Sequence, residues 1–163
     1  MLFSADNLKF MRLALKEAGR AFEMGEVPVG AVVIHNNQVI GKGYNQVESL
    51  KDPTAHAEMI AITAASNSIG SWRLNECDIY VTIEPCIMCT GAILHARLRN
   101  LFFAEFDPKF GACGSLYNLP DEKKYNHNLN VFSGLCADES RIMLLEFFRN
   151  LRLMKKSNPE SYS

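Results

Sequence analysis

The stretch CDIYVTIEPCIMC at residues 77–89 decides the fold of this chain. Residues 77–83 are rich in apolar and β-branched side chains, which is typical of a buried strand. A turn at Glu84 and Pro85 then leads into a helix that we expect to run from Cys86 to about His95. Because another apolar run follows at residues 101–106, this part of the chain is predicted to be a strand–helix–strand unit.

The residues before this stretch predict a helix, a hairpin and a second helix. Apolar side chains recur at helical spacing over residues 5–24, and β-rich runs at residues 27–34 and 38–44 are joined by Asn36 and Asn37, a good hairpin turn. Residues 45–51 are expected to be a polar loop. Asp52 as N-cap and Pro53 at the first helical position would then start a helix ending near residue 67.

The residues after it complete the predicted architecture. We expect residues 107–129 to be mostly loop with a short helix near 115–119, followed by a strand at 130–133 and a long amphipathic helix at 138–154. A hairpin followed by strand–helix–strand alternation indicates an α/β fold: a three-layer α/β/α sandwich with a mixed five-stranded sheet. The sequence predicts one domain over residues 1–154 and a polar tail over 155–163.

Composition limits the class of protein. The chain has 163 residues, of which 48% are hydrophobic, as expected for one domain with a substantial core. The charged N-terminus does not resemble a signal peptide, and no apolar run approaches the roughly 20 residues of a membrane helix. We therefore expect a soluble, cytoplasmic protein without a membrane partner. An odd number of cysteines, five, and a Cys-x-x-Cys spacing favour metal or redox chemistry over a disulfide framework.

Charge is distributed unevenly along the chain. The formal net charge is −1, which by itself argues against a nucleic-acid partner. Residues 147–163, however, contain four basic residues and one acidic residue: Arg149, Arg152, Lys155, Lys156 and Glu160. This basic end is compatible with a phosphate-binding patch and equally with a solvated helix end favoured by the helix dipole.

Two short segments carry the predicted chemistry. Cys86 and Cys89 are three residues apart at a helix start, so both sulfur atoms can face one side, where the helix dipole favours thiolates. His56 would add a nitrogen ligand, which gives zinc three protein ligands and leaves a fourth position for water. Glu58 lies about 200° around an ideal helix from His56, so the two can cooperate only in the first turn. Glu58 would then be a general base and acid beside the metal.

Other interpretations of these segments are possible. The two cysteines alone could be a redox pair, and a structural zinc site would need a fourth ligand, for which Cys113, His127 and Cys136 are available. His95 is expected to face away from the cysteines. The combined pattern favours an open, catalytic zinc site.

At these residues the chain resembles the cytidine-deaminase-like superfamily, whose signature is His-x-Glu followed by Pro-Cys-x-x-Cys. Within it, the chain is similar to the bacterial tRNA-specific adenosine deaminases over about residues 8–152. The more specific blocks are DPTAHAE at 52–58, DPK at 107–109 and FFR at 147–149.

The resemblance implies roles for individual residues. It implies that His56, Cys86 and Cys89 bind one zinc ion per subunit and that Glu58 is the proton shuttle. It further suggests that Asn45 binds the flipped base, with Val29 and Pro85 as pocket walls. For contacts to RNA it suggests Asp107, Phe148, Arg149 and Arg152. Packing explains Val29, Pro85 and Phe148 equally well, and loop capping is the less favoured alternative for Asp107.

The resemblance also implies an activity and partners: hydrolytic deamination of adenosine to inosine at wobble position 34 of a tRNA anticodon, in a homodimer, with an arginine tRNA as the expected substrate. Attack by an activated water at C6 of the adenine would release ammonia. Two rivals stay open: a deaminase of free bases or nucleotides (guanine, cytosine or dCMP) on the same fold, and a zinc-stabilised RNA-binding module without activity.

Overall fold

Five strands form one mixed sheet in the order β2-β1-β3-β4-β5 in the computed structural model, which describes residues 2–162. Strand β1 (Gly30–His35) pairs antiparallel with β2 (Gln38–Tyr44) and with β3 (Cys77–Ile83). Strands β3, β4 (Asn100–Glu105) and β5 (Asn130–Ser133) are parallel. The mixed five-stranded sheet expected from the sequence is therefore confirmed.

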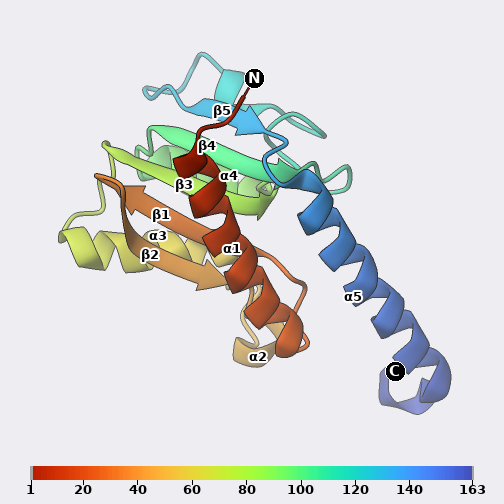
Figure 1. The fold of residues 1–163 in the computed structure, drawn as a ribbon. Coiled ribbons are helices and arrows are strands. Elements are labelled where there is room, and N and C mark those ends of the chain that lie inside the picture. The colour runs from red at the N-terminus through yellow and green to blue at the C-terminus, as the bar shows by residue number, and fades with distance from the viewer. Residues whose placement is uncertain (1, 163) are drawn as a thin grey trace.

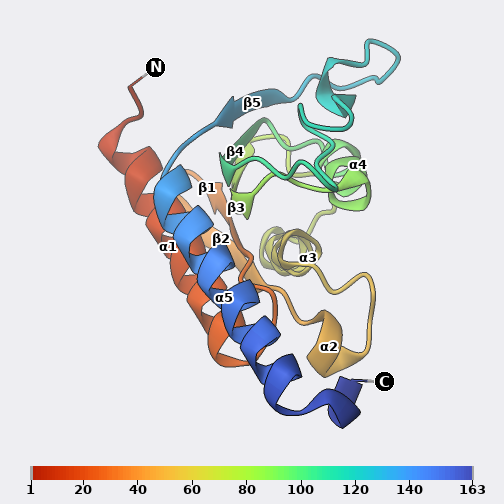
Figure 2. The same cartoon turned by 90° about the vertical axis from the view of Figure 1, so that its right-hand side faces the viewer.

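Helices cover both faces of this sheet (Figure 1). Helices α1 (Ala5–Glu23) and α5 (Ala137–Ser157) lie on one face, and α3 (Ala57–Ile69) and α4 (Ile87–His95) lie on the other, as Figure 2 shows. The three-layer prediction is thus correct. A short helix α2 (Val47–Leu50) and the 3₁₀ turns η1 (Leu119–Asp121) and η2 (Pro159–Tyr162) complete the elements. Helix α5 continues past residue 154, the expected end of the domain, to Ser157.

Local sequence signals explain most element boundaries. Ser4 caps α1 through a capping box with Asn7. Asn36 and Asn37 have φ values of 47° and 62°, the left-handed conformation that a two-residue hairpin turn requires and that asparagine tolerates. Strand β1 begins at Gly30 rather than at residue 27, since the strand pairing starts only after Pro28, which has no backbone N–H.

Three expectations about loops and helix starts were wrong. Asp52 caps a turn instead of a helix: its carboxylate accepts the N–H of Thr54 at 2.8 Å, and α3 begins only at Ala57. The predicted loop at 45–51 contains helix α2, in which the N–H groups of Glu48 and Ser49 donate to a buried carboxylate, Glu26, that is distant in sequence. The short helix expected near 115–119 lies at Leu119–Asp121.

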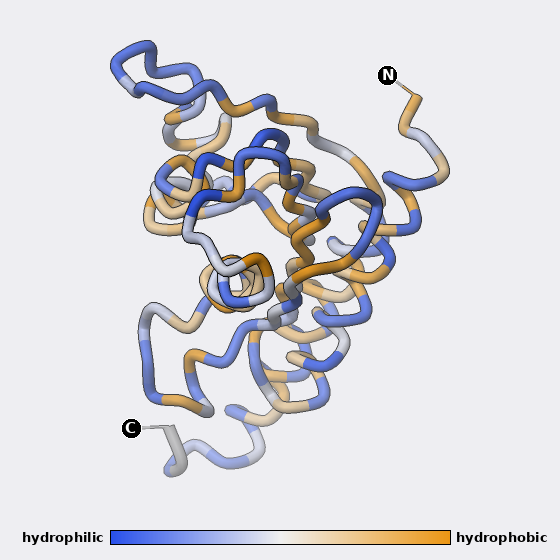
Figure 3. Tube along the Cα trace, turned by 90° about the vertical axis from the view of Figure 1, so that its left-hand side faces the viewer, coloured by the Kyte–Doolittle hydropathy of each residue, from blue (hydrophilic) through white to orange (hydrophobic). Residues whose placement is uncertain are grey.

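Two apolar clusters fill the space on either side of the sheet. One lies under α3 and α4 and includes Ile79, Leu101 and Phe103; the other lies under α1 and contains the stacked rings of Tyr80 and Phe102, whose centroids are 4.5 Å apart. In Figure 3 the hydrophobic colour gathers on the strands in the interior, whereas the projecting loops are mostly hydrophilic. Within residues 2–162, no helix combines the length and apolar character needed to cross a membrane.

Glycines on β2 bring α3 against the sheet. A Cβ at Gly43 would meet backbone atoms of Ala57 and Ala61, and a Cβ at Gly41 would meet those of Ala61 and Ala65. The backbone of α3 therefore lies directly on β2, and this contact fixes where the N-terminus of α3 lies.

Candidate metal centre and active site

Two helix N-termini on the same face of the sheet form the centre of the site. His56 is the N-cap of α3 and Cys86 the N-cap of α4, and both have extended backbones, with ψ values of 151° and 176°. Because an N-cap residue stands outside the helix, its side chain can reach past the helix end. Cys89 follows in the first turn of α4 and is buried.

The three side chains match the size of a tetrahedral zinc site. Nδ1 of His56 lies 3.6 Å from Sγ of Cys86 and 3.5 Å from Sγ of Cys89. Zinc–sulfur bonds of about 2.3 Å and zinc–nitrogen bonds of about 2.05 Å at a tetrahedral angle separate the two ligand atoms by about 3.6 Å. Both nitrogen–sulfur distances thus match those of a zinc site, and the three ligand atoms lie within 4.8 Å of one another.

Interactions among these side chains already favour a thiolate. The hydrogen bond from Cys89 lowers the pKa of Cys86 to about 4, with a further contribution from His56 and against the effect of burial. That same bond to Cys86 is the main cause of a raised pKa for Cys89, and the bond to Cys86 also raises the pKa of His56. A divalent cation between the sulfurs would favour deprotonation of both.

Glu58 lies in the first turn of α3 and is 3% exposed. The expected first-turn arrangement is confirmed in a sharper form: His56 is outside the helix and Glu58 is its second residue, so the 200° separation of an ideal helix does not apply. Burial raises the pKa of Glu58 to about 7, and its carboxyl interacts with the Cys89 thiol. A carboxyl with such a pKa can both accept and donate a proton near neutral pH.

The other candidate ligands lie away from this cluster or bond elsewhere; Cys136, for example, is the N-cap of α5. Within residues 2–162, the one cluster of ligand atoms close enough to hold a metal is His56, Cys86 and Cys89. His127 bonds to the carbonyl of Leu98 at 2.5 Å, and the Cys113 thiol lies 3.2 Å from the Thr90 hydroxyl. The site therefore keeps a position open beside the three protein ligands, as in catalytic zinc sites.

The expected pocket residues are Asn45, Val29 and Pro85. They are connected to the metal-binding residues by backbone hydrogen bonds or by direct adjacency in the sequence. The backbone of Asn45 donates to Val29, and the next residue donates to Ala55, directly before His56. The Asn45 side chain makes only two long hydrogen bonds, 3.3 Å to the Val27 carbonyl and 3.4 Å from the Val47 amide. Pro85 is buried and precedes Cys86.

The expected RNA contacts lie farther out. Asp107 caps its own loop, because its carboxylate accepts the N–H groups of Lys109 and Phe110. Phe148, Arg149 and Arg152 are exposed on α5, which packs on the sheet face opposite α3 and α4. The structure does not bring these three residues into contact with the metal centre.

The structure contains two buried carboxylates beside the site that the sequence did not predict. Glu26 and Glu84 are each 1% exposed and accept hydrogen bonds from backbone N–H groups of loops beside the site. The sequence contains no pattern that separates them from exposed glutamates, since their partners are 22 or more residues away.

The comparisons with known proteins agree with this geometry. The sequence model of the cytidine and deoxycytidylate deaminase zinc-binding region matches residues 4–105. The tRNA-specific adenosine deaminase of Bacillus subtilis (strain 168) is 44% identical over 154 residues, covering 94% of this chain and 96% of the relative. That of Aquifex aeolicus (strain VF5) is 45% identical over 143 residues, covering 88% and 94%.

Solved structures show the same fold. A tRNA:A34 deaminase, studied for A-to-I editing at the wobble position of transfer RNA, superposes with a TM-score of 0.81 at 43% identity, covering 83% of this chain and 99% of that one. A guanine deaminase from Nitrosomonas europaea reaches a TM-score of 0.76 at 22% identity, covering 90% and 86%, which shows the fold alone.

The match to a zinc-binding family, together with the tetrahedral fit, makes His56, Cys86 and Cys89 a site for one zinc ion per subunit. The chain belongs to the cytidine and deoxycytidylate deaminase zinc-binding family and, within it, to the group of the tRNA-specific adenosine deaminases.

Proposed function

We propose that this protein is a zinc-dependent hydrolase that converts adenosine to inosine at wobble position 34 of a tRNA anticodon and releases ammonia. The observation that carries the proposal is the buried Glu58 carboxyl beside an open His56–Cys86–Cys89 triangle. The similarity to named tRNA-specific adenosine deaminases over most of the chain supports the choice of adenosine in RNA over other amines.

Glu58 moves the protons in this reaction. When bound, zinc makes a water acidic enough to act as nucleophile at neutral pH. Glu58 accepts a proton as the oxygen attacks C6 of the adenine, and it delivers that proton to the ring nitrogen N1. It then transfers the remaining proton of the attacking oxygen to the amino group, which leaves as ammonia. The net change is adenosine plus water to inosine plus ammonia.

Asn45, Val29 and Pro85 hold the flipped base in this proposal. The Asn45 amide retains hydrogen-bonding capacity, since each of its two polar atoms makes one long bond to the backbone. A planar base can therefore receive a bond from Asn45 while Val29 and the buried Pro85 offer apolar walls. Burial of the base also removes water from the reacting centre.

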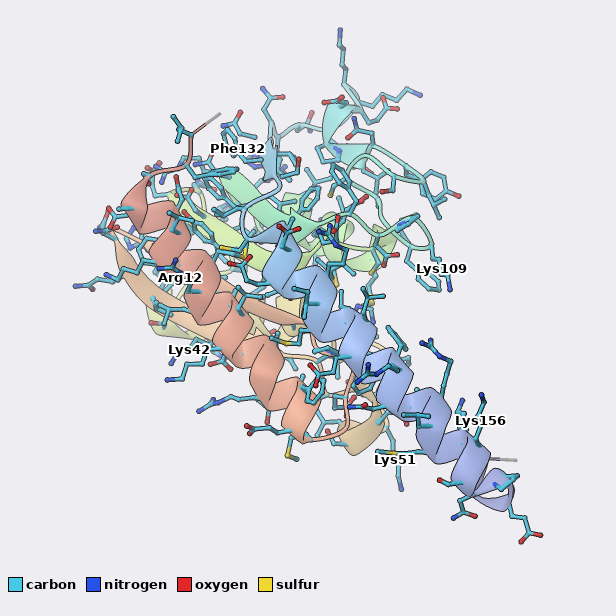
Figure 4. All side chains as sticks on the ribbon, turned by 45° about the vertical axis from the view of Figure 1, so that its right-hand side comes forward. Arg12, Lys42, Lys51, Lys109, Phe132 and Lys156 are labelled. Atoms are coloured by element: carbon cyan, nitrogen blue, oxygen red, sulfur yellow. The ribbon has the colours of Figure 1, made fainter. Side chains whose placement is uncertain are left out.

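The remaining candidate residues would contact the RNA. Asp107 would contact the RNA backbone, and Phe148, Arg149 and Arg152 on α5 would add stacking and phosphate contacts. Figure 4 shows Lys51, Lys109 and Lys156 projecting on one side of the molecule, apart from Arg12 and Lys42 on the other. We further propose a cytoplasmic homodimer acting on an arginine tRNA.

The test compares wild-type protein with Glu58→Gln, which keeps the shape of the side chain. Each protein, with its zinc content measured, is incubated with a tRNA transcript carrying adenosine at position 34, and inosine is scored by sequencing. We expect Glu58→Gln to keep its zinc and lose about 100- to 10,000-fold in rate. Glu76→Gln is the matched control, because Glu76 lies directly before β3, outside the site, and its side chain is 74% exposed.

The alternatives give different results in the same assay. A zinc-loaded wild type that leaves the tRNA unchanged but releases ammonia from guanine, cytosine or dCMP would be a small-molecule deaminase. Zinc and tRNA binding without any ammonia release would indicate an RNA-binding module. Near-wild-type conversion by Glu58→Gln would refute the role of Glu58.

A further inference from the structure

The Glu84 carboxylate is buried at the end of β3, two residues before Cys86, and the mechanism above does not use it. Four hydrogen bonds converge on it. Its Oε1 accepts the N–H of Asp107 at 3.1 Å and the hydroxyl of Ser115 at 2.5 Å. Its Oε2 accepts the N–H groups of Cys113 at 3.0 Å and Ser115 at 3.1 Å. All four donors belong to the segment that follows β4.

The ion pairs formed by residues 2–162 do not include Glu84. A buried carboxylate without hydrogen bonds is costly, and each hydrogen bond to a charged group contributes about 1.5–3 kcal/mol. A conformation of residues 107–115 that moved these donors away would lose the hydrogen bonds to Glu84, so the carboxylate favours the observed conformation.

The same segment is attached to the zinc-binding turn. The amide of Ala112 donates to the Pro85 carbonyl at 2.9 Å, and Gly111 forms an isolated β-bridge with Cys86. The carboxylate occupies the space where a Cβ of Gly111 would lie, so only glycine fits there. Glu84, Pro85 and Cys86 therefore hold this segment along one side of the metal centre.

Residues 106–117 expose several large apolar side chains to solvent, which is unusual for a surface loop. The exposed fraction is 46% for Phe106, 69% for Phe110, 54% for Leu116 and 58% for Tyr117. Lys109, between the two phenylalanines, projects outward in Figure 4. Exposed aromatic rings interleaved with a basic residue are the features that bind single-stranded nucleic acid, because every base can stack on a ring.

We propose that Glu84 is a positioning residue that holds residues 106–117 in register with the zinc site, so that their aromatic side chains contact the nucleotides flanking the target base. The choice of RNA as the occupant rests on the proposed function. Glu84 acts through the loop and does not touch the reacting atoms.

Glu84→Gln tests the proposal with little change in volume. The amide NH₂ should face Asp107 and Ser115 Oγ, because the serine hydroxyl can turn and accept, whereas the opposite orientation would set two N–H donors against it. The variant therefore loses chiefly the bond from Asp107. We expect amide hydrogen exchange at Asp107 to accelerate about tenfold or more, and the Kd and KM for an anticodon stem-loop RNA to rise about tenfold.

Two further readouts separate positioning from a structural defect. Zinc content and kcat at saturating RNA should stay within about twofold of wild type, and the Glu76→Gln control should match wild type throughout. Unchanged exchange and unchanged Kd in Glu84→Gln would overturn the proposal, as would a loss of zinc in place of a loss of RNA affinity. Failure of the wild type to edit adenosine 34 would instead contradict the proposed function, since exchange and RNA binding are measured without turnover.

Discussion

Replacing Gly43 by alanine should disable the site from a position outside it. A Cβ at Gly43 would lie 2.8 Å from the backbone nitrogen of Ala61 and closer still to the carbonyl oxygen of Ala57. Comfortable contact to carbon begins at about 3.5 Å, so α3 would have to retreat by roughly 1 Å. Ala57 lies between His56 and Glu58, and both side chains would move with it.

The magnitude follows from two effects. Overpacking of this kind costs about 1–3 kcal/mol in the free energy of unfolding. A displacement of about 1 Å at reacting groups can lower the rate by about 100-fold. We therefore expect Gly43→Ala to unfold at lower urea concentration and to lose about 100-fold in kcat on adenosine-34 tRNA.

Gly19→Ala is the matched control for this prediction. Gly19 lies inside α1, and a Cβ there would meet nothing within 4 Å. Alanine should stabilise the helix by about 0.5–1 kcal/mol and leave kcat unchanged. Wild-type stability and activity in Gly43→Ala would refute the close contact between β2 and α3 as the determinant of the site.

Three further perturbations address the metal, the RNA and the loop. Cys86→Ser should reduce zinc occupancy, measured by elemental analysis, and lower apparent stability by about 1.4 kcal/mol for each tenfold loss of zinc affinity; a full zinc complement would contradict its role as a ligand. Arg149→Ala with Arg152→Ala should weaken RNA binding and make log Kd less dependent on log salt, by about 0.7 for each lost phosphate contact, whereas an unchanged slope would remove α5 from the interface. Phe110→Ala should change stability by no more than about 0.5 kcal/mol and weaken RNA binding by about 1–3 kcal/mol, and unchanged binding would exclude stacking by this ring.

Local patterns allowed much of the architecture to be predicted. The boundaries of β2, β3 and β5 agree with the structure, because alternating or continuous apolar runs bounded by turn residues depend on neighbours in sequence. The predicted helix start at Asp52 was wrong because the start of α3 depends on a contact with a segment distant in sequence. Asp-Pro is an equally good start for a turn, and the position where α3 lies on β2 settles where its helix begins.

The sequence by itself determined which residues could carry the chemistry, since ligand type, spacing and helix-start signals are local properties. His56, Glu58, Cys86 and Cys89 could be named on that basis. Only the tertiary structure decided that three of them converge within 4.8 Å and that two buried glutamates hold the loops around them. The physical reason is that burial and these hydrogen bonds depend on contacts between segments far apart in the chain. No local sequence pattern indicates such contacts.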